Sequence, residues 1–495
     1  MRKSGILMHI SSLPSDYGIG TMGAEAYKFI DFLNNSKQRY WQILPVCPTS
    51  YGDSPYQSFS IYAGNPYFID LDMLKKDGLL KKSDYSTIDW GESPEYTDYE
   101  KIYNNRYKVL KKAYKRFCNG DKTDFYKFLD DNERWISNYA LFMSIKNENE
   151  GKCWLEWEDG LKHRDPHALW QFKESHLSEI EFWEFVQFKF FEQWQMMKEY
   201  ANENNIKIIG DIPIYVALDS ADVWVSPDLF ELDDTLLPTA VAGCPPDAFS
   251  ADGQLWGNPL YCWSRHKETD YGWWIDRIKI AIKLYDLVRI DHFRGFDEFY
   301  SIPYGDKTAR NGKWVQGPGI ELFRVMEEKI GKLPIIAEDL GFLTPTVKEL
   351  LVQSGFPGMK VLEFAFYPNS DSDYLPHNFD TNCVAYIGTH DNAPIKEWLK
   401  ETDSESVEFC KDYIGFTGKS ESNFIWALTK VMLASVADTA IMQMQDILEL
   451  GEESRMNTPS TSYGNWQWRM KKDAVSKTLE KKLAKLTKMY GRDNV

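Results

Sequence analysis

The sequence predicts an α/β protein built on a closed parallel (β/α)8 barrel of the TIM type. Three observations favour this fold. Eight short apolar runs rich in β-branched residues recur along the chain, and helical patterns lie between many of them. Strands that alternate with helices form parallel sheets, and eight such units close into a barrel. The chain of 495 residues is also long enough for one large barrel that carries insertions.

The predicted strands are, in chain order, 5–10, 40–46, 206–212, 284–290, 333–338, 359–364, 383–388 and 440–445. Helical patterns occur at 22–34, 271–284, 318–330, 344–354 and 422–436. The helix at 344–354 has the clearest ends. Thr344 is a favourable N-cap, Pro345 suits the first helical position, and Gly355 ends the helix.

Two gaps between predicted strands are too long for a simple crossover. Residues 71–200 are charged and show mainly helical patterns, so they predict a helical insertion after the second strand. Residues 213–270 contain several prolines and glycines and predict a loop-rich insertion over the active-site cleft, after the third strand. We therefore expect one catalytic barrel over 1–495, with no separate C-terminal β-sandwich domain.

Composition excludes several classes of protein. The net charge of −17 argues against a nucleic-acid partner or an acidic membrane surface. Seven scattered cysteines without a CxxC motif fit reduced thiols better than disulfides or a zinc site. The N-terminal apolar run is too short and polar for a signal peptide, and no stretch approaches about 18 apolar residues. We expect a cytoplasmic protein that does not enter membranes.

Charged residues stand at the ends of four predicted strands. In a strand, residues two apart share a face, so Arg289 and Asp291 point to the barrel axis while their neighbours point to the helices. Carboxylates end three further runs, and two of the four ends also carry a histidine: the additional residues are Asp211, His292, Glu338, Asp339, His390 and Asp391. Barrel active sites form at these carboxyl ends. The pattern predicts an active site there.

Converging carboxylates suit two kinds of chemistry. They bind a hard cation such as Mg²⁺, or they act as acid, base and nucleophile on a glycosidic bond. Arg289 would compete with a metal ion for Asp291, whereas in glycoside chemistry it lowers the pKa of Asp291 and keeps this nucleophile ionised. Repulsion from neighbouring carboxylates should keep a proton on Glu338. The sequence therefore favours glycoside chemistry.

The strand ends GDIPIYV, VRIDHFRG, IIAEDLG and IGTHDN resemble the four motif regions of the α-amylase clan. Four longer segments are similar to the 4-α-glucanotransferases (amylomaltases, glycoside hydrolase family 77): MHISSLPS, LPVCPTSYGDSPYQSFSIYAGNPYFID, GCPPDAFSADGQLWGNPLYCW and YGNWQWRM. The resemblance covers nearly the whole chain and is weakest in 71–200. It implies an enzyme without cofactor or metal that acts on maltooligosaccharides, amylose or other α-1,4-glucans.

The resemblance also implies residue roles. Asp291 would be the nucleophile, Glu338 the general acid/base, and Asp391 the carboxylate that stabilises the transition state by holding sugar hydroxyls. Substrate-binding roles are implied for Tyr56, Asp211, Trp256, Asn258, Arg289, His292, Asp339, His390 and Asn465. The loop 245–260 would lie over the cleft, with Trp256 as an acceptor-side or lid contact.

The implied reaction is transfer of a 1,4-α-glucan segment to the 4-hydroxyl of an acceptor, by a retaining double displacement through a glycosyl-aspartate. This mechanism requires the carboxyl groups of Asp291 and Glu338 to lie about 5–5.5 Å apart. A retaining α-1,4-glucan hydrolase of the same clan remains an alternative. A distant alternative is a dinucleotide site at GIGTMG (18–23). It is weakened because seven residues separate the strand from the glycines and the next strand lacks a terminal acidic residue.

Overall fold

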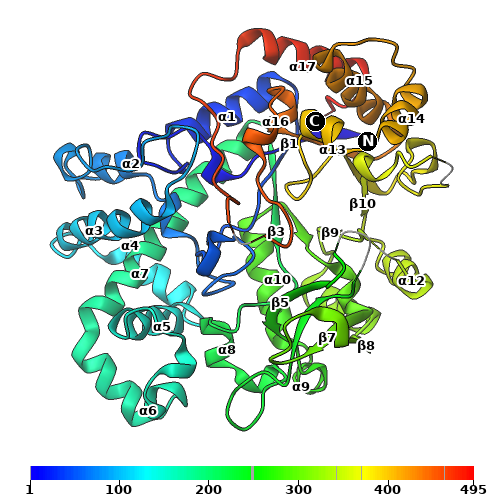
Figure 1. Cartoon of the computed structure of the whole chain (residues 1–495). Coiled ribbons are helices and arrows are strands. Elements are labelled where there is room, and N and C mark those ends of the chain that lie inside the picture. Colours follow the sequence, from blue (N-terminus) through cyan, green and yellow to red (C-terminus); the bar gives the residue numbers. More distant parts are fainter. Residues whose placement is uncertain (1, 247–249, 342, 369–370, 462, 495) are drawn as a thin grey trace.

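The computed structural model describes residues 2–246, 250–341, 343–368, 371–461 and 463–494. Eight parallel strands form its central sheet, in the order β10-β11-β12-β1-β2-β3-β6-β9. Strands β1, β3, β9 and β10 of this sheet are labelled in Figure 1. The bounds of the eight strands are β1 Lys3–Leu7, β2 Tyr40–Gln42, β3 Lys207–Ile212, β6 Leu287–Ile290, β9 Ile335–Ala337, β10 Gly358–Val361, β11 Cys383–Tyr386 and β12 Thr439–Gln443. Each strand overlaps its predicted range, so the predicted fold class is confirmed.

The two edge strands of this sheet, β9 and β10, meet through two hydrogen bonds. The backbone N–H of Ala337 donates to the carbonyl of Pro357 at 2.9 Å. The backbone N–H of Met359 donates to Oδ1 of Asp339 at 2.6 Å. Because a parallel sheet whose edges meet has the geometry of a barrel, these contacts complete the (β/α)8 architecture.

Helices cover the outside of the barrel. Those that follow barrel strands are α1 Ala24–Asn35, α10 Gly272–Leu284, α11 Ile320–Ile330, α12 Pro345–Ser354, α13 Ile395–Glu401, α14 Ser404–Ile414 and α15 Glu421–Ala434. The five predicted helices are all present. In α12 the cap is as predicted, because Val347 N–H donates to Thr344 Oγ1 at 3.4 Å and Gly355 takes a left-handed φ of 68°. The terminal helix α17, Lys477–Met489, packs against α1 and α15.

Residues 71–200 contain helices that form the left side of Figure 1. They are α2 Leu71–Lys76, α3 Tyr99–Phe117, α4 Thr123–Asp131, α5 Ile136–Glu148, α6 Asp159–Lys162 and α7 Pro166–Glu203. Aromatic rings join them: Phe117 and Phe185 lie with ring centroids 4.8 Å apart. Helix α7 also packs against α1, so it doubles as the barrel helix before β3. Its Gln187 exchanges hydrogen bonds of 2.7 and 2.9 Å with the backbone of Gly64, which anchors the loop after β2.

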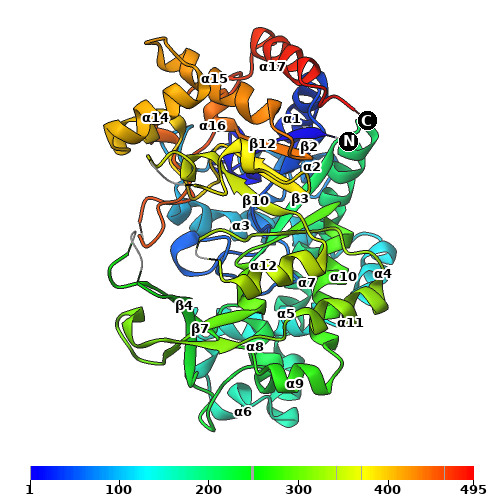
Figure 2. The ribbon, with the colours of Figure 1, turned by 90° about the vertical axis from the view of Figure 1, so that its right-hand side faces the viewer.

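A second sheet lies in the lower half of Figure 2, away from α14, α15 and α17. It is antiparallel, in the order β5-β4-β7-β8, with bounds β4 Ala240–Cys244, β5 Gln254–Pro259, β7 Glu298–Pro303 and β8 Lys313–Gln316. Residues 213–270 also hold α8 Ala221–Val225 and α9 Trp263–Glu268. The segment predicted to be rich in loops therefore also contains two strands and two short helices. The prolines and glycines of this segment interrupt the apolar alternation from which strands are predicted. Strand β4 pairs with β5 and also with β7, and β7 pairs with β8; both β7 and β8 follow β6 in the chain.

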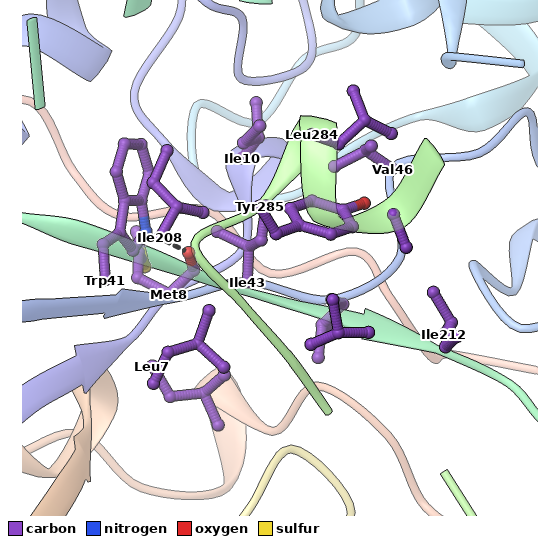
Figure 3. Close-up of a cluster of buried hydrophobic side chains, with 14 of the residues drawn as sticks. Leu7, Met8, Ile10, Trp41, Ile43, Val46, Ile208, Ile212, Leu284 and Tyr285 are labelled. Atoms are coloured by element: carbon purple, nitrogen blue, oxygen red, sulfur yellow. Dashed lines mark hydrogen bonds between the residues drawn. The ribbon is translucent and has the colours of Figure 1, made fainter. Parts of the chain in front are cut away.

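The core between β1, β2, β3 and α10 is shown in Figure 3. Leu7, Ile43 and Ile208 are buried there, and full burial of one such side chain stabilises the fold by about 1.5–3 kcal/mol. Tyr285 packs against Gly210, where an added Cβ would lie 2.2 Å from the tyrosine ring. Gly210 is thus required next to Asp211, because only glycine leaves room for this ring.

The described residues after β12 form α16 Met444–Ile447, a short 3-10 helix Glu452–Ser454 and α17, with no further sheet among them. Across the described part of the chain, no helix combines the length and apolar character needed to span a bilayer.

Candidate active site

Arg289 on β6 lies between two carboxylates at the carboxyl end of the barrel. Its guanidinium is 2.6 Å from Asp211 Oδ2 and 3.0 Å from Asp291 Oδ1. The side chain of Asp211 is 0% exposed, whereas that of Asp291 is 31% exposed. Register explains the arrangement, since Asp211 and Arg289 are paired residues on the adjacent strands β3 and β6. Asp291 is therefore the member of this triad that a substrate can reach.

Glu338 lies beside Asp291. Residue His292 takes a left-handed conformation, with φ 53° and ψ 49°, which turns the chain directly after Asp291. Its backbone N–H donates to Glu338 Oε2 at 2.6 Å, and Leu340 N–H donates to Oε1 at 2.9 Å. Strands β6 and β9 are neighbours in the barrel, which is why residues 47 positions apart meet here. The acid and nucleophile predicted from the sequence thus face one site.

The pKa values of both carboxyl groups are raised. Burial raises the pKa of Asp291 well above its usual range; Arg289 opposes this, while Glu338, Asp211 and Asp391 add to it. Burial likewise raises the pKa of Glu338, again against Arg289. Arg289 acts in the predicted direction, since it lowers the pKa of Asp291, but burial outweighs it and the net shift is upward. The pair consequently retains a proton to higher pH than isolated carboxyl groups do.

Tyr56 and His390 connect Asp211 to Asp391. The Tyr56 hydroxyl donates to Asp211 Oδ2 at 2.8 Å and lies 2.9 Å from His390 Nε2. A phenol has one proton, so His390 Nε2–H is the donor in the second bond. Burial lowers the pKa of His390, which fits a neutral ring. The two rings are stacked, with centroids 5.3 Å apart and planes 12° apart.

Asp391 follows β11 and faces the same site. Its Oδ2 lies 3.3 Å from His390 Nε2, and its Oδ1 accepts a hydrogen bond of 2.6 Å from Asn457 Nδ2. The side chain of Asp391 is 41% exposed and is therefore more open to solvent than that of Asp291 or Asp211. The three residues predicted as catalytic therefore lie on one end of the barrel.

The other predicted binding residues divide into two groups. Trp256 lies edge to face with His292, with centroids 4.8 Å apart, and the buried Nε2 of His292 has no protein partner. Asn258, Asp339 and Asn465 instead bond to the protein itself. Asn258 Nδ2 donates to the Val216 carbonyl at 2.8 Å, and Asp339 accepts from Met359 N–H at the barrel seam.

The side chain of Asn465 closes a loop. Its Oδ1 accepts from Thr458 N–H at 2.9 Å, and its Nδ2 donates to the Thr461 carbonyl at 3.1 Å. Sequence reasoning missed Asn457, which precedes this loop and contacts Asp391. The signal that could have found it was its place in RMNTP, shortly before the YGNWQWRM segment that carried the resemblance to known enzymes.

The glycines of 18–23 pack against the protein. A Cβ at Gly20 would lie 1.9 Å from the Ile10 carbonyl oxygen, and one at Gly23 would lie 2.0 Å from Asp70 Oδ2. Each close approach is to the chain's own atoms, so these positions do not form an open cradle for a pyrophosphate. The described residues likewise contain no group of three His, Cys, Asp or Glu side chains placed to hold a metal ion.

Several known proteins that are similar to this chain share one description, 4-alpha-glucanotransferase or amylomaltase. A family described as 4-alpha-glucanotransferase matches residues 8–475. The 4-alpha-glucanotransferase of Clostridium butyricum is 50% identical over 487 residues, covering 98% of this chain and all of that protein. That of Streptococcus pneumoniae is 49% identical over 496 residues, covering 100% and 98%. The amylomaltase of Streptococcus agalactiae, solved in complex with acarbose, superposes with a TM-score of 0.97 at 44% identity and full coverage of both chains. The chain therefore belongs to the 4-alpha-glucanotransferase family.

Proposed function

We propose that the chain catalyses 4-α-glucan transfer with Asp291 as nucleophile, Glu338 as general acid/base and Asp391 as stabiliser of the transition state. The observation that carries this assignment is the hydrogen bond from the residue after Asp291 to Glu338, since it brings two carboxyl groups of raised pKa to one open site. Two such groups flanking one bond are what glycoside chemistry requires.

Arg289 decides which carboxyl group is ionised. Asp291 has a guanidinium at 3.0 Å, whereas Glu338 is held by two neutral backbone N–H groups. A cation stabilises the negative form of its neighbour more than neutral donors do, so the retained proton is assigned to Glu338. A carboxyl group has about four lone-pair positions, and the two backbone bonds leave Glu338 free to deliver that proton.

The reaction then runs in two steps. Glu338 gives its proton to the departing glycosidic oxygen while Asp291 attacks the anomeric carbon, which leaves the glucan as an ester on Asp291. Glu338 next takes the proton from the 4-hydroxyl of the acceptor, whose oxygen displaces Asp291 and remakes an α-1,4 bond. Both steps invert the anomeric carbon, so the product retains its configuration.

The substrates proposed are maltooligosaccharides, amylose and other α-1,4-glucans. A relative with 44% identity is described in complex with acarbose, which supports a glucan ligand at this site. The unpartnered Nε2 of His292 is available to a sugar hydroxyl, and the face of Trp256 suits the CH-rich face of a sugar ring. Four of the predicted binding residues hold the carboxylates of Asp291 and Asp391 in place: Tyr56, Asp211, Arg289 and His390. Three others hold the surrounding loops: Asn258, Asp339 and Asn465.

Transfer exceeds hydrolysis only when an acceptor is oriented and water is kept away. We assign this task to the loop 245–260, of which residues 247–249 lie outside the described residues. Trp256 extends from this loop to His292, next to Asp291. Seven cysteines without a disulfide support the proposal that the enzyme works in the reducing cytoplasm.

Incubation with maltotriose tests the reaction. A ladder of longer and shorter maltodextrins indicates transfer, whereas glucose and maltose alone would indicate the hydrolase alternative. An Asp291→Asn variant should give no ladder. Glu338→Gln, incubated with a glycosyl fluoride that needs no acid to depart, should accumulate a glycosyl ester detectable by intact-protein mass; an ester on another residue would refute Asp291 as nucleophile.

A further inference from the structure

We propose that Asn457 is a positioning residue that orients the carboxylate of Asp391 for turnover, and that Arg455 holds Asn457 in place. The inference rests on the role proposed above for Asp391. Its starting point is the 2.6 Å hydrogen bond from Asn457 Nδ2 to Asp391 Oδ1, which joins the loop after β11 to a segment 66 residues later.

The backbone around Asp391 is fixed without Asn457. Asp391 N–H donates to Thr389 Oγ1 at 3.3 Å, and Asn392 Oδ1 accepts from both the N–H and the hydroxyl of Thr389 at 2.9 Å. The carboxylate, by contrast, is 41% exposed, and among the described residues it is contacted by His390 Nε2 and by Asn457 Nδ2. Asn457 therefore orients the carboxylate of Asp391, and this orientation determines how the carboxylate can bind a substrate hydroxyl.

Arg455 links Asn457 to the same helix that follows Asp391. Its Nε donates to the Asn457 carbonyl at 3.2 Å, and its Nη1 donates to Glu397 Oε1 on α13 at 3.0 Å. The side chain of Glu397 is 8% exposed, so this ion pair is shielded from water. Helix α13 begins at Ile395, four residues after Asp391, and its first N–H donates to buried Asp446 at 2.8 Å. Asp391 and Asn457 are thus attached to one rigid element.

The chemistry of Asn457 gives a test that packing alone does not predict. Asn457→Asp keeps the shape but replaces the donor by a second carboxylate next to Asp391. When that new carboxyl group is protonated, it can donate again. The titratable and charged groups near this pair of side chains come from five parts of the site: His390 and Asp391 after β11, Glu397 and Glu401 on α13, Arg455 two residues before Asn457, Asp211 on β3, and Arg289 on β6 with Asp291 directly after it.

The experiment measures maltotriose disproportionation by full-length N457D and N457A at about pH 7.5 and about pH 5. A misplacement of about 1 Å at a reacting group can cost about 10²-fold in rate, so N457D should lose about 100-fold in kcat at the higher pH with KM changed less than about threefold. The kcat of N457D divided by that of the wild type should rise at least about tenfold from the higher to the lower pH. The same ratio for N457A should stay constant.

Asn382→Asp is the matched control, because it makes the same chemical change at the other end of β11. Asn382 is exposed and its Nδ2 donates to the Gly355 carbonyl at 3.1 Å, so N382D should keep wild-type turnover at both pH values. Equal thermal midpoints for the variants and wild type establish that all are folded.

An Asp391→Asn variant separates the two proposals. Wild-type turnover by D391N would overturn the role of Asp391 itself. An inactive D391N together with N457D that keeps wild-type kcat at the higher pH would overturn the role of Asn457 alone. The role of Asn457 would also be overturned if N457D and N457A lost kcat equally and if the kcat of each variant relative to wild type did not change with pH. A residue that only packs against its neighbours would give this result.

Discussion

Replacing Arg289 by methionine separates what this residue does for the fold from what it does for the reaction. The substitution keeps an unbranched chain but removes the cation between Asp211 and Asp291. Asp211, 0% exposed, is contacted by Arg289 and by the Tyr56 hydroxyl, so the substitution leaves it with the Tyr56 hydroxyl as its side-chain partner. Breaking a buried ion pair by removing one partner costs about 3–5 kcal/mol. We expect R289M to lose that much stability at neutral pH.

The loss of stability in R289M should be larger at neutral pH than at acidic pH. Without Arg289, the buried carboxylate of Asp211 carries an uncompensated charge whenever it is ionised. Protonation of a buried carboxylate removes this charge, so the destabilisation caused by the substitution should decrease as the pH is lowered. The difference in urea midpoint between R289M and wild type should therefore be smaller at about pH 5 than at about pH 7.

The double variant R289M/D211N is the control for this reasoning. It removes the uncompensated buried charge together with the arginine, so its stability should return to within about 1–2 kcal/mol of wild type. Its turnover should stay low, because Asp291 still lacks its cation. Wild-type stability of R289M at neutral pH, or restored turnover in the double variant, would refute the two separate roles.

Four further predictions concern single positions. Tyr56→Phe leaves buried Asp211 and His390 each short of one partner and should cost about 2–4 kcal/mol in urea unfolding and at least tenfold in kcat; unchanged values would contradict the network. Gly210→Ala places a methyl group 2.2 Å from the ring of Tyr285 and should lower stability by about 1–3 kcal/mol without changing the pKa values that control the pH–rate profile. Arg492→Met removes four hydrogen bonds of 2.7 to 3.0 Å to backbone carbonyls below β1 and should cost about 3–5 kcal/mol at unchanged KM, measured by urea unfolding and maltotriose kinetics. Burial raises the pKa of Asp446 to about 7, above its unfolded value, so its ionisation destabilises the fold as pH rises through 7; Asp446→Asn should reduce the fall in thermal midpoint between about pH 6 and 8.

Local sequence patterns predicted the barrel and the position of its site. Each of the eight apolar runs identified in the sequence overlaps a strand of the barrel, and alternation along a strand decides which side chains face the axis. Arg289 and Asp291 obey that alternation, and Asp211 pairs with Arg289 in register. The caps of α12 are likewise local, because Thr344, Pro345 and Gly355 act on the helix to which they belong.

Non-local pairing was beyond the reach of such patterns. The second sheet unites β4 and β5 with β7 and β8, which lie on the other side of β6 in the chain. Asn457 reaches Asp391 only because the segment after β12 folds back over the barrel end. The AVAGC segment has no periodic pattern that predicts its pairing with β5 and β7, and the RMNTP segment has none that predicts its contact with Asp391.

The sequence by itself determined which carboxylates stand at the strand ends, because that follows from the two-residue period of a strand. Only the tertiary structure decided their electrostatics. The pKa of Asp291 depends on how Arg289 is divided between two neighbours and on how much water the folded site excludes. Charge sharing and desolvation are sums over groups from different strands, so they exist only once β3, β6 and β9 lie side by side.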